Sequence, residues 1–244
     1  MKPLRPSAAF HLVCSDKPRN GKTLYARLLA EYLSLCHRHP AVFDASSGIC
    51  EFHIARCTPV DLSSPAGQMA LFDRALELPV RDYVVDVAAH LLRVASGVMK
   101  TIGYAEAART QGLAVVVHFL VDRTLDSLVA ALTVRSEIDP ARLIAIRNEW
   151  VTPPFVEPAA LRRYGELAKE GEIVIPPIDR RSIEGIEDEA FSFADFARAP
   201  ERVAYFRRQD IRAFLARVYE QFDALGLARE FRDYREERRL REPG

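Results

Sequence analysis

Apolar residues along the chain form short continuous runs that alternate with longer stretches of helical spacing. The short runs predict strands at residues 8–14, 41–44, 81–87, 113–121, 143–146 and 172–175. The run at 113–121 is almost unbroken, as in strands of a parallel sheet that are covered on both faces. Helical spacing predicts helices at 22–37, 66–78, 89–111, 124–136, 158–170 and 209–225, with Gly97 and Gly103 as candidate breaks. Residues 52–55 form a further candidate strand, and 178–200 are expected to be loop with one short helix.

About six strands therefore alternate with helices, without an internal repeat. This alternation predicts an α/β fold with right-handed crossovers: a doubly wound, mainly parallel sheet flanked by helices in three layers. The length fits one domain over 1–244, with a core at about 8–225 and a charged C-terminal helix or tail at 226–244. Ligands of such sheets bind at the carboxyl ends of the strands.

Composition narrows the functional classes. The formal net charge is zero, so the molecule as a whole gives no electrostatic case for nucleic acid or an anionic membrane. No apolar stretch approaches the ~18 residues of a membrane span, and the N-terminus lacks the apolar core of a signal peptide. We therefore expect a cytoplasmic protein without a transmembrane segment. The four cysteines are not at C-x-x-C spacing and are expected to be buried, reduced thiols: Cys14, Cys36, Cys50 and Cys57.

The first predicted strand leads into a loop and a Gly-Lys-Thr sequence that opens a helix. This is the context of a phosphate-binding loop, in which backbone N–H groups and a helix N-terminus converge on an anion. Lys22 would reach the outer phosphates, and the Thr23 hydroxyl would ligate Mg²⁺. The usual pattern has glycine at the place of Asp16.

Three polar side chains follow other predicted strands. Asp44, Asp86 and Asn148 all lie at strand ends, so a parallel sheet would bring them to the edge that holds the loop. His118 lies inside an apolar strand and is interpreted as a hydrogen-bonded core histidine.

The loop resembles the deviant Walker A motif of the ParA/MinD family of P-loop ATPases, of the SIMIBI class. The family loop reads close to N-Q-K-G-G-V-G-K-T, and residues 15–23 have the same length, with Lys17 at the place of the signature lysine. Pro18, Arg19 and Asn20 stand where the family has Gly-Gly-Val.

The resemblance implies a role for each strand-end residue. Asp44 looks like the carboxylate that orients the attacking water, although Ser46 replaces a second acid that the family often carries. Asp86 is similar to the Walker B aspartate, which binds Mg²⁺ through a water, but Ala88-Ala89 replace the two prolines that usually follow.

Nucleotide contacts are implied along the loop and at two later positions. Asn148 would contact the adenine ring, and the segment around Pro176 would close over the base. The implied nucleotide-binding residues are Asp16, Lys17, Pro18, Arg19, Asn20, Gly21, Lys22, Thr23, Leu24, Asn148 and Pro176.

The resemblance predicts an ATP- and Mg²⁺-binding protein that hydrolyses ATP slowly. Lys17, Lys22 and Asp44 would act in catalysis, and Lys17 would reach the partner's phosphates across an ATP-dependent homodimer. Such a switch would partition or position a cargo, either DNA or protein. The mixed charges of the C-terminal tail favour a solvated helix over a nucleic-acid patch or membrane anchor. Two alternatives stay open: a small-molecule kinase or ligase of the dethiobiotin synthetase type, and a non-hydrolysing nucleotide-binding partner protein.

Overall fold

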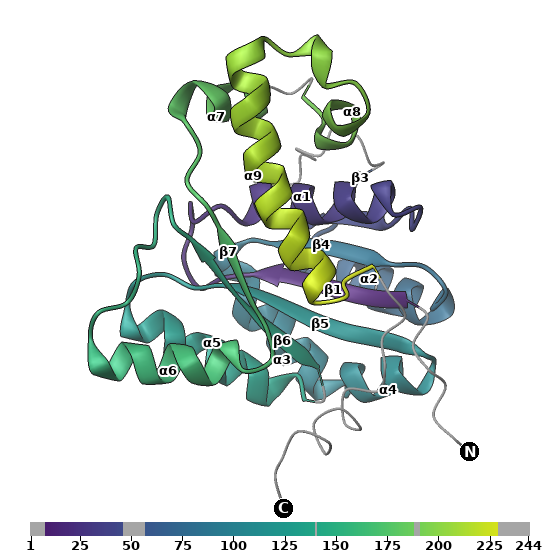
Figure 1. Cartoon of the computed structure of the whole chain (residues 1–244). Coiled ribbons are helices and arrows are strands. Elements are labelled where there is room, and N and C mark those ends of the chain that lie inside the picture. Colours follow the sequence, from purple (N-terminus) through teal and green to yellow (C-terminus); the bar gives the residue numbers. More distant parts are fainter. Residues whose placement is uncertain (1–7, 46–56, 140, 188–190, 229–244) are drawn as a thin grey trace, which may run out of the picture.

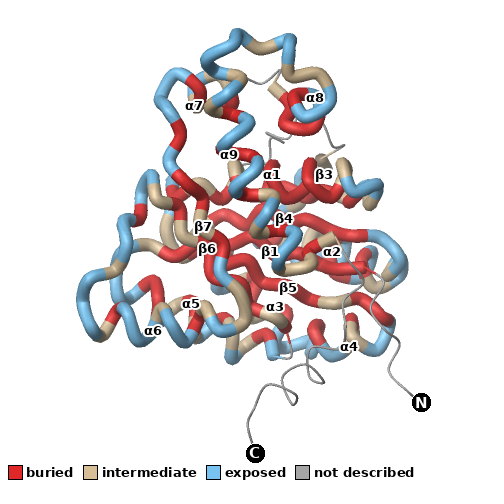
Figure 2. Tube along the Cα trace, in the orientation of Figure 1, coloured by how far each residue is buried: buried red, intermediate tan, exposed pale blue. Residues whose placement is uncertain are grey.

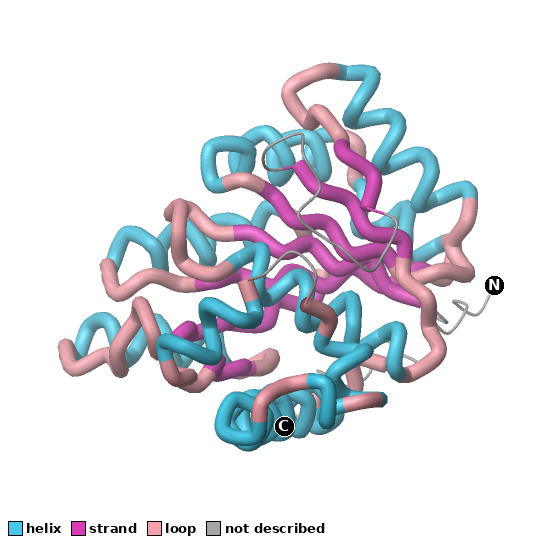
Figure 3. The backbone as a smooth tube through the Cα atoms, turned by 90° about the horizontal axis from the view of Figure 1, so that it is seen from above, coloured by secondary structure: helices cyan, strands magenta, loops and turns pink. Residues whose placement is uncertain are grey.

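The computed structural model describes residues 8–45, 57–139, 141–187 and 191–228 and contains one parallel sheet. The strand order is β3-β2-β4-β1-β5-β6-β7, and every neighbouring pair is parallel. Seen from above, the strands run side by side in the middle of the molecule (Figure 3). Their bounds are β1 (Ala8–Cys14), β2 (Ala41–Ala45), β3 (Cys57–Pro59), β4 (Tyr83–Val87), β5 (Leu113–Leu120), β6 (Arg142–Asn148) and β7 (Glu172–Ile175).

Helices cover both faces of the sheet (Figure 1). One face packs against α1 (Lys22–Leu35) and α9 (Tyr205–Ala224), and beyond α1 lie α7 (Arg180–Ile186) and α8 (Phe193–Arg198), which share the same apolar core. The opposite face packs against α2 (Pro65–Glu77), α3 (Leu92–Thr101), α4 (Tyr104–Thr110), α5 (Leu125–Glu137) and α6 (Pro158–Ala168). Two 3-10 turns precede helices: η1 (Ala89–Leu91) lies before α3 and η2 (Pro200–Arg202) before α9. The three-layer α/β/α fold expected from the sequence is confirmed.

The sheet lies between two apolar cores because side chains alternate along each strand. In β1, Phe10 and Leu12 enter the core beneath α2 to α6, whereas Ala9 and Val13 face α1. The central strands are buried throughout, as Figure 2 shows in red. This double cover explains why their sequences are almost continuously apolar.

The chain changes direction in the sheet at β1. On one side of β1 lie β4, β2 and β3, in that order outward from β1. On the other side the chain adds β5, β6 and β7 in succession. The carboxyl end of β1 therefore lies between those of β4 and β5, at the switch point where open α/β sheets bind ligands.

Several predicted boundaries need correction. The sheet has seven strands, whereas about six were predicted. The additional one is the short edge strand β3, which carries no apolar pattern that would predict it. Gly103, with φ of 61°, does separate α3 from α4, but Gly97 lies inside α3. Residues 178–200 contain two short helices, α7 and α8, where one was predicted. The candidate strand at 52–55 lies outside the described residues.

The expectation of buried, reduced thiols is wrong for Cys36 and Cys57. Cys14 is a buried free thiol, as predicted. Cys36 is free but exposed, because the last turn of α1 leaves the sheet there. Cys57 is disulfide-bonded, and its partner lies outside the described residues. Within the described chain, no helix combines the length and apolar character needed to cross a membrane.

Two buried charged side chains of α1 hold the helices above it. Arg27 donates to the carbonyls of Ile186 and Phe191, at 3.1 and 2.9 Å, and lies over the Phe193 ring. One turn later Glu31 accepts from the N–H of Ala194 at 2.7 Å. Burial raises the pKa of the Glu31 carboxyl to about 7. Helix α1 thus anchors the segment that contains α7 and α8.

A polar chain also crosses the core between α1 and the sheet. The Tyr25 hydroxyl lies 2.8 Å from Nδ1 of His118, whose Nε2 lies 2.9 Å from Nδ1 of His11. All three side chains are fully buried, which confirms His118 as a hydrogen-bonded core histidine. Burial lowers the pKa of His11 to about 4 and that of His118 well below its usual value.

These two histidines make stability depend on pH. An unfolded histidine has a pKa near 6.5, so between about pH 6.5 and pH 4 the unfolded chain binds more protons than the folded one. Stability from the pair is complete above that window and falls as the pH falls through it. We expect His118→Gln to flatten the slope of unfolding free energy against pH by about 1.4 kcal/mol per pH unit.

Urea unfolding of both proteins at several pH values between about 7 and 5 measures this slope. Glu31, whose raised pKa acts in the opposite direction, is present in both proteins and cancels in the difference. Equal slopes for the wild type and the variant would contradict the lowered pKa values assigned to the two histidines.

Candidate functional site

The loop between β1 and α1, residues 15–21, wraps around the N-terminus of α1. Two of its residues have left-handed backbone conformations, Arg19 with φ of 57° and Gly21 with φ of 93°. Gly21 is the N-cap of α1, and no described side chain caps the helix. The backbone N–H groups of the first turn are thus left without a side-chain acceptor, which is the arrangement that favours an anion.

Two asparagine side chains attach the loop to the sheet. The buried Asn20 amide donates to the Ser15 hydroxyl and to the carbonyl of Leu120, at the end of β5. Asn148, at the end of β6, donates to the carbonyl of Asn20 at 3.1 Å. A side chain at Gly21 would place its Cβ 2.5 Å from the Asn148 amide nitrogen. The loop is therefore bonded to the carboxyl ends of two neighbouring strands.

The first two residues of α1 carry the predicted phosphate and metal contacts. Lys22 is buried, and its ammonium group folds back to donate to the carbonyl of Lys17 at 3.1 Å. Burial lowers the pKa of Lys22, and the nearby carboxylate of Asp86 partly offsets this. The hydroxyl of Thr23 donates to Asp86 at 2.6 Å. The structure thus joins the Gly-Lys-Thr sequence to the predicted Walker B aspartate.

Asp44 and Asp86 form a pair of carboxylates on neighbouring strands. They lie opposite each other in the parallel pairing of β2 and β4, and both are fully buried. Val42 and Val84, two positions earlier, face α1, so the strand alternation points both aspartates to the same side. Three predicted residues therefore lie together beside the N-terminus of α1: Thr23, Asp44 and Asp86.

At the start of the loop, Asp16 is tied to helix α5. The hydroxyl of Ser127 donates to Asp16 at 2.5 Å and accepts from the N–H of Asp122. Lys17 forms an ion pair with Asp16 at 3.3 Å, and 41% of its side chain is exposed. Asp16 thus acts as a bridge to α5, and Lys17 lies at the surface.

The other predicted contacts surround this centre. Pro18 and Arg19 are exposed at the tip of the loop, and Leu24 is half-buried in the first turn of α1. Pro176 is buried directly after β7. Asn148 is buried with its amide bonded to the loop, while its carbonyl oxygen accepts from the N–H of Trp150. Its predicted contact with adenine stays a prediction.

Sequence reasoning missed the side chains that support the loop. Ser127 and the inward-facing amide of Asn20 contact the site through partners about a hundred residues away in the sequence. A serine in the first turn of the helix at 124–136 was the only available signal. Serine is common in such positions, so the sequence could not single it out.

The donors at this site suit Mg²⁺ better than a transition metal. The described residues contain no group of three or more His, Cys, Asp or Glu side chains arranged to hold a metal ion. Mg²⁺ needs only one or two carboxylates, with waters and substrate phosphates completing its octahedron. The two predicted metal residues, Thr23 and Asp86, fit that requirement.

No family model and no curated protein matches the sequence. Similar solved structures include a nucleotide-binding protein in complex with ADP from Archaeoglobus fulgidus. It is 14% identical over 86% of this chain and 93% of that chain, with a TM-score of 0.45. Another is the MinC:MinD cell division protein complex of Aquifex aeolicus, at 12% identity over 87% and 96% of the two chains, with a TM-score of 0.42.

The identities and TM-scores of both structures are too low to carry a functional argument, so function has to be argued from this chain's own residues.

The geometry at Gly21 predicts a strong local effect of a single methyl group. We expect Gly21→Ala to lower the free energy of unfolding by about 1–3 kcal/mol, because φ of 93° strains any L-residue and the new Cβ would meet the Asn148 amide. Urea denaturation measures this change.

Gly97→Ala is the matched control, since a Cβ there meets nothing within 4 Å and Gly97 lies inside α3. This variant should gain about 0.5–1 kcal/mol from helix propensity. If Gly21→Ala is as stable as Gly97→Ala, the loop conformation described here is wrong.

Proposed function

We propose that the protein binds ATP with Mg²⁺ at the loop between β1 and α1 and hydrolyses it slowly. The observation that carries the proposal is the hydrogen bond from Thr23 to Asp86 beside the buried Lys22. A hydroxyl, a carboxylate and an ammonium group at an uncapped helix N-terminus are the groups that nucleotide phosphates and their metal require.

In this proposal the phosphates lie against the backbone N–H groups at the start of α1. Lys22 exchanges its bond to the Lys17 carbonyl for a phosphate oxygen. The exchange costs little reorganisation, because the ammonium group already lies over the loop. Asn20 and Asn148 hold the loop backbone in place through contacts on its inner side.

Thr23 and Asp86 would hold Mg²⁺, Asp86 through a water. The ion, when bound, neutralises charge on the phosphate oxygens. Asp44 would orient the attacking water, since it is the carboxylate directly opposite Asp86 in the sheet. Ser46, which replaces a second acid, lies outside the described residues. A single orienting carboxylate supports slow turnover, which suits a switch better than a metabolic enzyme.

Lys17 is the residue that would couple nucleotide binding to dimerisation. Its side chain is partly exposed, and its carboxylate partner among the described residues is the adjacent Asp16. Partly exposed pairs contribute about 0–1 kcal/mol, so Lys17 could leave Asp16 for a partner's phosphates at little cost. The ATP-bound homodimer would then act on a cargo, either DNA or protein.

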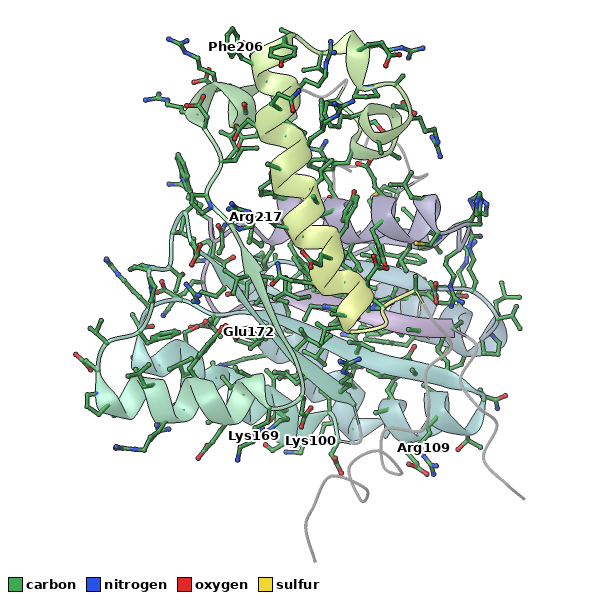
Figure 4. All side chains as sticks on the ribbon, viewed as in Figure 1. Lys100, Arg109, Lys169, Glu172, Phe206 and Arg217 are labelled. Carbon is green, nitrogen blue, oxygen red and sulfur yellow. The ribbon has the colours of Figure 1, made fainter. Side chains whose placement is uncertain are left out.

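We expect Lys22→Ala to weaken ATP·Mg binding by at least about 30-fold, because charge-assisted contacts contribute roughly 2 kcal/mol. Isothermal titration calorimetry measures the affinity. Lys169→Ala, which removes an exposed lysine after α6, should bind as the wild type does (Figure 4). Unchanged binding in Lys22→Ala would rule out the loop as the nucleotide site.

Lys17→Ala should bind ATP·Mg with nearly unchanged affinity and lose ATP-dependent dimerisation in sedimentation velocity. Phosphate release measured on the same preparation distinguishes the ATPase switch from the two alternative functions. A dimer that persists in Lys17→Ala contradicts the switch. ATP consumption only with a metabolite present would favour the kinase or ligase alternative, and binding without turnover would favour the non-hydrolysing partner.

A further inference from the structure

The helices above α1 form a projecting lobe at the end of the molecule away from α3 to α6 (Figure 1). We call it the apical lobe and define it as α7, α8, η2 and the first two turns of α9. It is not loosely attached, because Arg27 and Glu31 of α1 bond its backbone from below. None of the residues proposed for nucleotide binding lies in it.

A pocket of about 320 Å³ opens in this lobe, between α7, the segment before α8 and the start of α9. Phe191, Val203 and Ile211 make its apolar wall, and Ile211 is almost fully buried. The volume is at the small end of ligand pockets and fits one or two amino-acid side chains. Residues from three separate elements shape the pocket, so the fold defines it.

The polar part of the pocket consists of arginines. Arg202 and Arg207 line it, and no acidic residue of the described ranges does. Within the described chain, neither guanidinium group is paired with a carboxylate. The nearby Arg208 instead donates to the carbonyls of Glu201 and Val203, which fixes the wall between the two arginines. The pocket thus combines an apolar wall with two positively charged side chains.

Two large aromatic side chains beside the pocket are exposed to solvent. Tyr205 is 63% exposed and Phe206 is 88% exposed, and their rings pack edge to face at 5.8 Å. Figure 4 shows Phe206 at the outer end of α9, away from the sheet. Exposed aromatics and arginines together are the residues that most often anchor protein partners.

From this geometry we propose that the apical lobe is a docking site for an acidic segment of a partner protein. An apolar side chain of the partner enters the pocket against Phe191 and Ile211. Flanking carboxylates pair with Arg202 and Arg207, and Tyr205 and Phe206 cover the bound segment.

Charge complementarity favours a peptide over a broad anionic surface. The exposed surface around the pocket also carries Glu187 and Glu201, which would repel a nucleic acid or an anionic membrane. At the pocket, Arg202 and Arg207 offer two positive charges without a carboxylate partner among the described residues, which suits a ligand of defined shape.

Selection from a phage-displayed library of random peptides on the full-length protein tests the proposal. Enriched peptides should carry Asp or Glu next to an aromatic or aliphatic residue. Fluorescence anisotropy with the most enriched peptide should show binding weakened by about tenfold or more in the Arg202→Glu/Arg207→Glu double variant, because like charges replace two charge-assisted contacts.

The matched control is Arg212→Glu/Arg217→Glu, which reverses two exposed arginines of α9 outside the pocket and should change binding by less than about twofold. Circular dichroism checks that both variants fold. Phe206→Ser should also weaken binding, without any charge change.

Three results would overturn the proposal. The first is a selection that enriches no acidic peptides. The second is peptide binding that survives Arg202→Glu/Arg207→Glu. The third is assignment of the lobe to another occupant, either phosphatidylglycerol vesicles in a flotation assay or a second copy of the chain in sedimentation, with loss of that association in the same variant.

Discussion

The N-terminus of helix α1 is held in place from three sides, and the rest of the site depends on this constraint. Asn20 and Asn148 bond the preceding loop to the ends of β5 and β6, and Thr23 bonds the helix itself to Asp86 at the end of β4. Strands on both sides of β1 contribute to these contacts. The loop therefore keeps its shape although Arg19 has a left-handed backbone conformation. A phosphate-binding loop needs this rigidity, since its backbone N–H groups must already point at the anion before it arrives.

The same helix continues away from the loop to the apical lobe. Its first turn carries Lys22 and Thr23, and its second and third turns carry Arg27 and Glu31, which hold the lobe. Phe191, whose carbonyl accepts from Arg27, also lines the lobe pocket. One rigid element thus contacts both the proposed nucleotide site and the proposed docking site.

Most of the fold could be predicted from the sequence, because buried parallel strands and amphipathic helices leave distinct apolar patterns. Strand β3 and the helices α7 and α8 left no such pattern, as they are short and partly exposed. In the site, the sequence order brought Lys22, Thr23, Asp44 and Asp86 to one sheet edge, and the structure places them there. The supporting contacts of Ser127, Asn20 and Asn148 could not be predicted, since a hydrogen bond between distant residues follows from packing and leaves no periodic signal.

The central claim is that a nucleotide binds at the start of α1, and amide hydrogen exchange with and without ATP·Mg tests it most directly. The N–H groups of the first turn of a helix have no partner within the helix, so they exchange fast until a ligand accepts their hydrogen bonds. The account predicts slower exchange at residues 19–24 when ATP·Mg is added. Unchanged exchange there at saturating nucleotide would contradict it, as would protection confined to other parts of the chain.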